Sequence, residues 1–144
     1  MSAVDHQLQE ILDRAADEAR QDGATAIEAH HLLLALPHDV LSSVGLDHGA
    51  IRAALDREFE HSLGAVGVSL AVYDRPRATS DRDRPTQLGA SAKLAMERGF
   101  STVSRKKDLR PAHLLLGVLQ AEVGTVPRAL ALAGVDRADL ISRL

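Results

Sequence analysis

The stretch His31-Leu-Leu-Leu-Ala-Leu36 recurs in the second half of the chain as His113-Leu-Leu-Leu-Gly-Val118. Self-similarity of this kind marks a duplicated structural unit, in which neighbouring copies bury their apolar faces against each other. Each run is apolar enough for a buried helix, but it is too short to be stable alone. The sequence therefore predicts two copies of one helical unit, each with a histidine before three leucines.

A second pair of segments extends the repeat. Gly45-Leu46-Asp47 recurs as Gly134-Val135-Asp136, and apolar residues follow both at matching spacing, namely Ile51, Leu55, Leu140 and Leu144. An alternative register pairs residues 63–69 with residues 130–136, which leaves the end of the first copy open. We expect a single domain over residues 1–144, made of repeat one (about 4–60), a linker (about 61–87) and repeat two (about 88–144).

Length and composition favour an all-α fold. A chain of 144 residues is the size of one domain with its own hydrophobic core. The absence of cysteine excludes disulfides, thiolate zinc sites and cysteine nucleophiles. With one Tyr, two Phe and no Trp, the interior must be built from Ala, Leu and Val, which suits closely packed helices better than a β-sandwich.

Apolar periodicity places the helices of the first half. Three- and four-residue spacing predicts a helix over residues 4–20, which ends at Asp22-Gly23. A buried helix is expected over residues 30–36, before Pro37. Asp47 is a candidate N-cap for a helix that runs to about Glu60. The residues expected to face inward on that helix are Ile51, Ala54, Leu55 and Phe59.

The pattern is interrupted before the second half resumes. Residues 74–86 combine mixed charges with prolines, which predicts an exposed linker. Helical spacing then returns at Leu88, Ala92, Ala95, Met96 and Val103, although Gly99 is a candidate position for a kink or break. Pro111 suits the first turn of the next helix, and short helices are expected from about Val126 and from Asp136.

The charge pattern gives little support for nucleic-acid or membrane binding. Lys+Arg 17 against Asp+Glu 20 leaves a formal net charge of −3, which provides no general attraction to phosphate. The basic run Arg105-Lys106-Lys107, with Arg110, is expected to be a solvated surface, and a nucleic-acid-binding regulator is the lower alternative. Neither a membrane span nor a signal peptide is visible, so we expect a cytoplasmic protein.

Candidate chemistry is also sparse. His30, His31 and His38 suggest a metal, but adjacent helical residues point about 100° apart, so we expect no metal or cofactor. His31 and His113 are instead expected to satisfy backbone groups near a buried helix start.

The motifs of enzymes are missing as well. The sequence has no Gly-x-Ser-x-Gly elbow and no phosphate loop, and Ser42, Ser43 and Ser69 lack recognisable partners. These observations predict a protein that is not an enzyme.

The repeated segments resemble the amino-terminal repeat domain of Clp (Hsp100) ATPases, whose two repeats each carry a hydrophobic-Gly-Thr-Glu-His-Ile-Leu-Leu-Gly-Leu signature. Ala15-Ala-Asp-Glu-Ala-Arg20 is similar to part of that domain's first helix. Ala92-Lys93 and Met96-Glu97 are similar to the corresponding part of its second repeat. The resemblance covers nearly the whole chain, and it implies an all-α fold of about eight helices in two pseudo-symmetric halves.

The same resemblance implies a non-catalytic binding module of the Clp chaperone-protease system. Such a domain receives protein or peptide substrates and adaptors, and it presents them to the unfolding ring of a Clp ATPase. We expect a stand-alone or divergent member that acts as an adaptor or decoy. The alternative is sequestration of small cyclic peptides that target Clp ATPases. The oligomeric state stays open.

One implied site is the phosphoarginine pocket of some family members, where the signature Glu pairs with the guanidinium. The matching positions here are His30 and Ala112, and the signature Thr is replaced by Ala29 and Pro111. Neither copy offers a fixed negative charge. We therefore expect weak or absent phosphoarginine binding.

A second implied site lies between the first helix and the start of the second repeat, where apolar side chains receive adaptors or cyclic peptides. The matching residues are Val4 and Leu8 on one side and Leu88, Ala92 and Met96 on the other. The alternative is that all five are ordinary core residues, because spacing alone does not separate a groove from a core.

Overall fold

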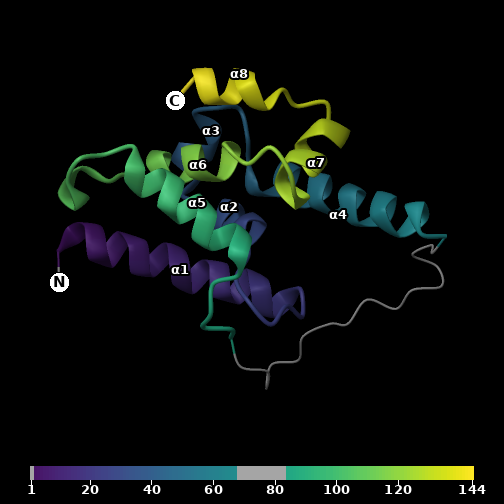
Figure 1. The fold of residues 1–144 in the computed structure, drawn as a ribbon, viewed down its shortest axis with the longest axis horizontal. Coiled ribbons are helices and arrows are strands. Elements are labelled where there is room, and N and C mark those ends of the chain that lie inside the picture. The colour runs from purple at the N-terminus through teal and green to yellow at the C-terminus, as the bar shows by residue number, and fades with distance from the viewer. Residues whose placement is uncertain (1, 68–83) are drawn as a thin grey trace.

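The computed structural model describes residues 2–67 and 84–144, and within these ranges the regular secondary structure is helical apart from one isolated β-bridge (Figure 1). The helices are α1 (Ala3–Gln21), α2 (Ala29–Ala35), α3 (His38–Ser42), α4 (His48–Ala65), α5 (Ala90–Ser101), α6 (Pro111–Leu119), α7 (Thr125–Leu132) and α8 (Arg137–Ser142), with a 3₁₀ turn η1 (Lys106–Asp108) before α6. The predicted all-α class is confirmed. Residues 68–83 of the expected linker, Ser69 among them, lie outside the described residues.

The two halves repeat the same local structure. In both, a glycine with positive φ ends a helix, Gly45 at 78° and Gly134 at 74°. The next backbone N–H then bonds back to a carbonyl, Leu46 to Leu41 and Val135 to Leu130, at 2.9 Å each. This is the Schellman arrangement that closes a helix C-terminus. The match pairs α3 with α7 and α4 with α8, which favours the register that aligns these two glycines.

Helix α1 begins and ends where its caps require. The Ser2 hydroxyl accepts the Asp5 N–H at 3.1 Å, and the Asp5 carboxylate accepts the Ser2 N–H in return. Such a capping box satisfies two donors that a helix start leaves free. Asp22 caps the other end. One face of the helix is buried, and it carries Ile11, Ala15, Ala16 and Ala19.

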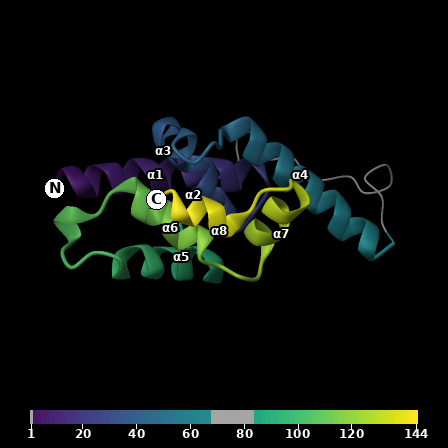
Figure 2. The same ribbon diagram turned by 90° about the horizontal axis from the view of Figure 1, so that it is seen from above.

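Helix α2 lies at the centre of the molecule (Figures 1 and 2). It packs against α1, α4, α5, α6 and α7, so both repeats surround it. The buried apolar side chains of both halves form one continuous cluster, in which the leucines after His31 meet those after His113. The short α2 helix is therefore stabilised by its neighbours, because it lacks the length to be stable alone.

Helices α5 and α6 approach each other closely through glycine. A Cβ on Gly117 would lie 2.1 Å from the Ala95 carbonyl oxygen, and one on Gly99 would lie 2.9 Å from the His113 carbonyl oxygen. Helix α5 continues through Gly99 to Ser101, so the break considered at this position does not occur. The glycine serves the helix contact rather than a bend.

Two details of the predicted helices differ in the structure. Helix α4 continues to Ala65, beyond Glu60. Its buried position after Leu55 is Glu58, at 6% exposure, whereas Phe59 is half-buried. The Glu58 carboxylate accepts hydrogen bonds from Arg128 of α7 at 3.0 Å and from the Ser62 hydroxyl at 2.7 Å. Burial of this carboxylate is tolerated because both partners lie within reach.

The start of the second repeat is joined to the first by backbone pairing. Leu88 precedes α5 and forms a parallel bridge with Ile27, so the helical spacing that included Leu88 is wrong at this position. Gly89 donates its N–H to the Ile27 carbonyl at 2.7 Å. The Ala29 N–H donates to the Ser91 hydroxyl at 2.9 Å, and Ser91 in turn donates to Glu28. The starts of α2 and α5 therefore hold each other in place.

Candidate functional site

Val4 and Leu8 face the connection between α5 and α6 at the end of the molecule where α1 begins (Figure 1). Leu8 also lines a larger groove of about 410 Å³. We call this the N-terminal groove, and its lining residues are Leu8, Phe100, Val103, Ser104, Arg105, Lys106 and Leu109. Leu109 is fully buried, but Phe100 keeps 42% of its surface exposed, so the groove offers an aromatic ring to a partner.

The rim of the N-terminal groove is basic, but most of its charges are engaged. Lys106 pairs with Asp5 of α1, and Arg105 Nε pairs with Asp108 at 3.1 Å. The Arg110 guanidinium donates to the carbonyls of Lys107 and Leu109 at 3.0 Å each. The hydrogen bond from Lys106, followed by those from Ser2, holds the pKa of Asp5 well below its usual range. The basic run therefore anchors the η1 turn to α1.

The other three residues expected beside Val4 and Leu8 do not form one surface with them. Ala92 is fully buried, so it belongs to the core and is closed to any partner. Met96 is half-buried and packs against that core. Leu88 lines a separate hollow with Leu12 and Ala16 of α1. These contacts arise because α1 and α5 run in opposite directions, which brings the start of α1 to the end of α5 (Figure 1).

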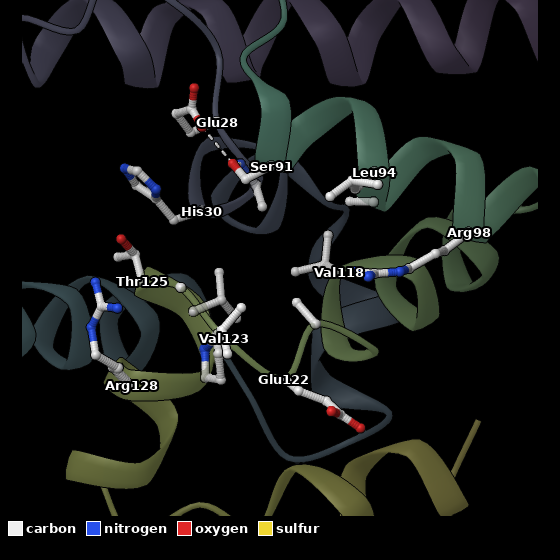
Figure 3. Close-up of a pocket in the computed structure, with 16 residues that line it drawn as sticks. Glu28, His30, Ser91, Leu94, Arg98, Val118, Glu122, Val123, Thr125 and Arg128 are labelled. Carbon is white, nitrogen blue, oxygen red and sulfur yellow. Dashed lines mark hydrogen bonds between the residues drawn. The ribbon is translucent and has the colours of Figure 1, made fainter.

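A second hollow lies between α2, α5 and the start of α7, with a volume of about 250 Å³ (Figure 3). We call it the α5–α7 pocket. Its walls carry Glu28 and His30 from the first repeat, Ser91, Leu94 and Arg98 from α5, and Val118, Glu122, Val123, Thr125 and Arg128 from the second repeat. Residues of both repeats therefore meet in this pocket.

His30 presents a neutral ring to the α5–α7 pocket. Burial, and after it the neighbouring His31, lowers the pKa of His30 to about 4. The imidazole is therefore uncharged at pH 7, where it donates or accepts one hydrogen bond. It does not supply the negative charge that a guanidinium ligand would need.

His31 and His113 make the same backbone contact in the two repeats. His31 Nδ1 accepts the Glu28 N–H at 2.9 Å, and His113 Nδ1 accepts the Arg110 N–H at 2.8 Å. Each imidazole thereby satisfies a donor at the start of its helix, in the place of a capping side chain. Ala112 lies beside His113 and is half-buried.

A solved structure of a chaperone domain is similar to the chain over almost its full length. It is the crystal structure of the N-terminal domain of the caseinolytic protease associated chaperone ClpD from Arabidopsis thaliana, at 20% identity and a TM-score of 0.62. The match covers 95% of this chain and 88% of that one. The chain has a Clp N-terminal domain-like fold. No protein-family model matches the sequence.

The Clp N-terminal domain-like fold brings together a cluster that resembles a metal site. Ligand atoms of Asp22, His30 and His31 lie within 4.8 Å of one another, whereas His38 is not among them. Because His31 Nδ1 accepts a backbone hydrogen bond, the neutral ring carries its proton on Nε2, which donates to Asp22 at 2.9 Å. That nitrogen has no lone pair for a metal. Two possible ligands remain, so these residues do not fit a metal ion.

Charges around Asp22 complete the cluster. Burial acts to raise the pKa of Asp22, but the hydrogen bond from His31 and the charge of Arg52 outweigh it and lower the pKa. Arg52 also pairs with Glu18, whose other oxygen lies 2.9 Å from His48. This network links α1 to α2 and α4, which gives it a structural role.

The serines considered as nucleophiles have backbone partners where the structure describes them. The Ser42 hydroxyl donates to the Asp39 carbonyl at 3.1 Å, and the Ser43 hydroxyl donates to the Val40 carbonyl at 2.6 Å. Both hydroxyls lie at the end of α3. None of the helices in the two described ranges combines the length and hydropathy that a bilayer crossing requires.

Phe100, Val103 and Leu109 line the N-terminal groove but were not expected there from the sequence. The sequence gives only a weak indication of these groove residues. Phe100 is one of only two phenylalanines, and it lies just before the basic run. The sequence gives even less indication of the α5–α7 pocket. Its walls come from segments far apart in the chain, and only the packing of the two repeats against each other brings them together.

Proposed function

We propose that this chain is a non-catalytic protein- or peptide-binding module related to the Clp chaperone-protease system, and that the N-terminal groove receives the partner. The observation that carries the proposal is an apolar, solvent-open groove on a fold shared with the N-terminal domain of a chaperone. The expected partners are unfolded substrates or adaptors of a Clp ATPase. In this role the chain acts as an adaptor or as a decoy for such an ATPase.

The chemistry of the groove supports a polypeptide ligand. Phe100 and Val103 supply apolar surface next to the buried Leu109, and exposed aromatic side chains contribute strongly to protein interfaces. The rim cations Arg105 and Lys106 are already paired with Asp108 and Asp5, so the apolar surface is the part of the groove open to a polypeptide. Of the residues expected from the family resemblance, Leu8 belongs to this groove, Val4 lies beside it, and Leu88 and Met96 lie outside it.

A binding titration tests the proposal. Fluorescein-labelled casein serves as an unfolded polypeptide, and its anisotropy is followed as the purified chain is added. We expect Phe100→Ala to weaken binding about tenfold, because it removes the exposed ring. Val66→Ala is the matched control. Val66 is 74% exposed at the end of α4, far from the groove, and its loss should leave affinity unchanged (Figure 1). Unchanged affinity in Phe100→Ala would contradict the proposal.

The size of the groove also supports the second candidate, sequestration of a small cyclic peptide. About 410 Å³ lies within the range of about 300–1,000 Å³ that is typical of small-ligand sites. A competition experiment separates the candidates. A decoy or adaptor changes the rate at which a Clp ATPase and its protease degrade casein without any cyclic peptide. A sequestering protein changes that rate only when the cyclic peptide is present.

Phosphoarginine and nucleic acid are the further ligands to exclude. With neutral His30 and with Ala112 at the two family positions, we expect calorimetry to show no micromolar binding of phosphoarginine. Filter binding at two salt concentrations tests nucleic acid. We expect little retention, because three of the four cations of the basic run already contact protein groups.

A further inference from the structure

The α5–α7 pocket contains an arginine that is not neutralised. No residue within 2–67 or 84–144 forms an ion pair with the Arg98 side chain. The guanidinium extends from α5 toward Val118 in the pocket wall (Figure 3). The other arginine of the pocket, Arg128, differs because it is paired with the buried Glu58 at 3.0 Å. Arg98 is therefore the cation available to a ligand.

The acidic groups of the pocket are either occupied or turned away. The Glu28 carboxylate accepts the Ser91 hydroxyl, and it lies so close to Gly89 that a Cβ there would be 1.4 Å from one of its oxygens. The Glu122 carboxylate points out at the far rim, away from His30 and Thr125 (Figure 3). The neutral His30 ring adds no charge to the pocket, so the Arg98 guanidinium is the group there with which an anion would pair.

The remaining walls are apolar and open. Val123 is 85% exposed and Leu94 is 48% exposed, so two large aliphatic side chains stand at the mouth with little protein cover. Val118 forms the floor between them. Large aliphatic side chains that are exposed next to a hollow are typical of an interaction site. The ligand therefore needs an apolar group within reach of its anionic group.

The volume limits the ligand to a small part of a polypeptide. About 250 Å³ lies below the range of about 300–1,000 Å³ of pockets that enclose a drug-sized molecule. One or two side chains fit, whereas a folded segment does not. A chain terminus combines both required groups in one residue, an apolar side chain and an α-carboxylate.

We propose that the α5–α7 pocket binds the C-terminal residue of a peptide, with the α-carboxylate paired with Arg98 and an aliphatic side chain against Leu94, Val118 and Val123. Arg98 supplies two parallel N–H donors, the geometry that a carboxylate accepts best. Thr125 and His30 line the same hollow and are available for the adjoining peptide group. This site is separate from the N-terminal groove. It extends the proposed function by giving the chain a second place to bind a peptide.

Nuclear magnetic resonance titration of the ¹⁵N-labelled chain tests the inference. The probes are N-acetyl-Gly-Ser-Ala-Leu as the free acid and the same peptide as its C-terminal amide. We expect the free acid to shift signals of residues 91–98 and 123–128 in a saturable way, and to bind about tenfold more tightly than the amide. In Arg98→Gln the free acid should bind as weakly as the amide does. The matched variant Arg14→Gln, at an exposed position of α1 outside both proposed sites, should change neither affinity.

Four results would contradict a C-terminal carboxylate site in the α5–α7 pocket. Equal affinity for the acid and the amide, absence of saturable shifts, or an acid preference that survives Arg98→Gln would overturn the proposal. So would an amidated peptide with an internal aspartate that binds as well as the free acid, because the pocket would then recognise any carboxylate. The spectrum of each variant also reports whether it is folded. The casein titration with Phe100→Ala probes the other site, so either proposal is able to fail alone.

Discussion

At the scale of single residues, neighbouring histidines have opposite roles. His31 and His113 bind backbone N–H groups at the starts of their helices, a role that the repeated His-Leu-Leu-Leu pattern indicated. His30 faces the α5–α7 pocket, a position that the sequence does not indicate, because its counterpart in the second repeat is Ala112. The burial of Glu58 was not predictable from the sequence either, since it depends on Arg128 from the other repeat. A side chain whose partner comes from far along the chain carries no local signal.

The depressed pKa of His30 makes stability depend on pH. An unfolded histidine takes up its proton near pH 6.5, whereas the folded one does so near pH 4. Between these values the unfolded state binds more protons, so the free energy of unfolding falls as the pH falls through this window. The loss amounts to at most about 3 kcal/mol. Below about pH 4 the free energy of unfolding falls further, because the pKa of Asp22 is lower in the folded state than in the unfolded state.

The variant His30→Gln tests this dependence. Glutamine takes up no proton, so urea unfolding at pH 7, 5.5 and 4.5 should show a smaller decline in the variant than in the unmodified chain. The difference between the two declines isolates His30 from the other histidines. Identical declines would show that His30 titrates normally in the folded protein.

At the scale of elements, helix positions follow from the sequence more closely than helix contacts do. The caps at Asp22, Asp47 and Asp136 and the proline at the start of α6 fixed the expected boundaries. The role of Gly99 was not foreseen, because the requirement for glycine comes from α6 and not from α5 itself. Periodicity describes one helix at a time, and close packing involves two.

Substitutions of two helical glycines, one in the contact between α5 and α6 and one on the open surface of α4, should have opposite effects on stability. Gly117→Ala places a methyl group 2.1 Å from a backbone oxygen of α5, so the helices must separate, at a cost of at least about 2 kcal/mol. Gly64→Ala in α4 meets no atom within 4 Å, and it should stabilise the chain by about 0.5–1 kcal/mol through helix propensity. Urea denaturation measures both. A neutral Gly117→Ala would show that α5 and α6 are less closely packed than described.

At the scale of the whole molecule, the fold was predictable and the binding surface only partly so. Duplication, helix spacing and the resemblance to Clp domains gave the all-α architecture. Of the five residues expected at one surface, Ala92 is core and Leu88 lines a different hollow. The orientation of α1 against α5 decides which residues meet, and no pattern within either helix encodes that orientation.

The shared core predicts that neither repeat folds alone. Helix α2 packs against α5, α6 and α7, so a fragment of residues 1–67 exposes apolar surface that the second repeat normally covers. Circular dichroism of this fragment and of residues 84–144 should show little helix for each alone, and the helical signal should return when the two are mixed. A fragment that unfolds cooperatively by itself would contradict the single core.

The most direct test of the central claim is hydrogen exchange of the chain with and without saturating casein. If the N-terminal groove receives an unfolded polypeptide, exchange should slow in residues 3–11 and 100–109 and stay unchanged in α4. Protection that appears only in α4 and α8, or no protection anywhere at saturation, would show that this groove is not where polypeptides bind.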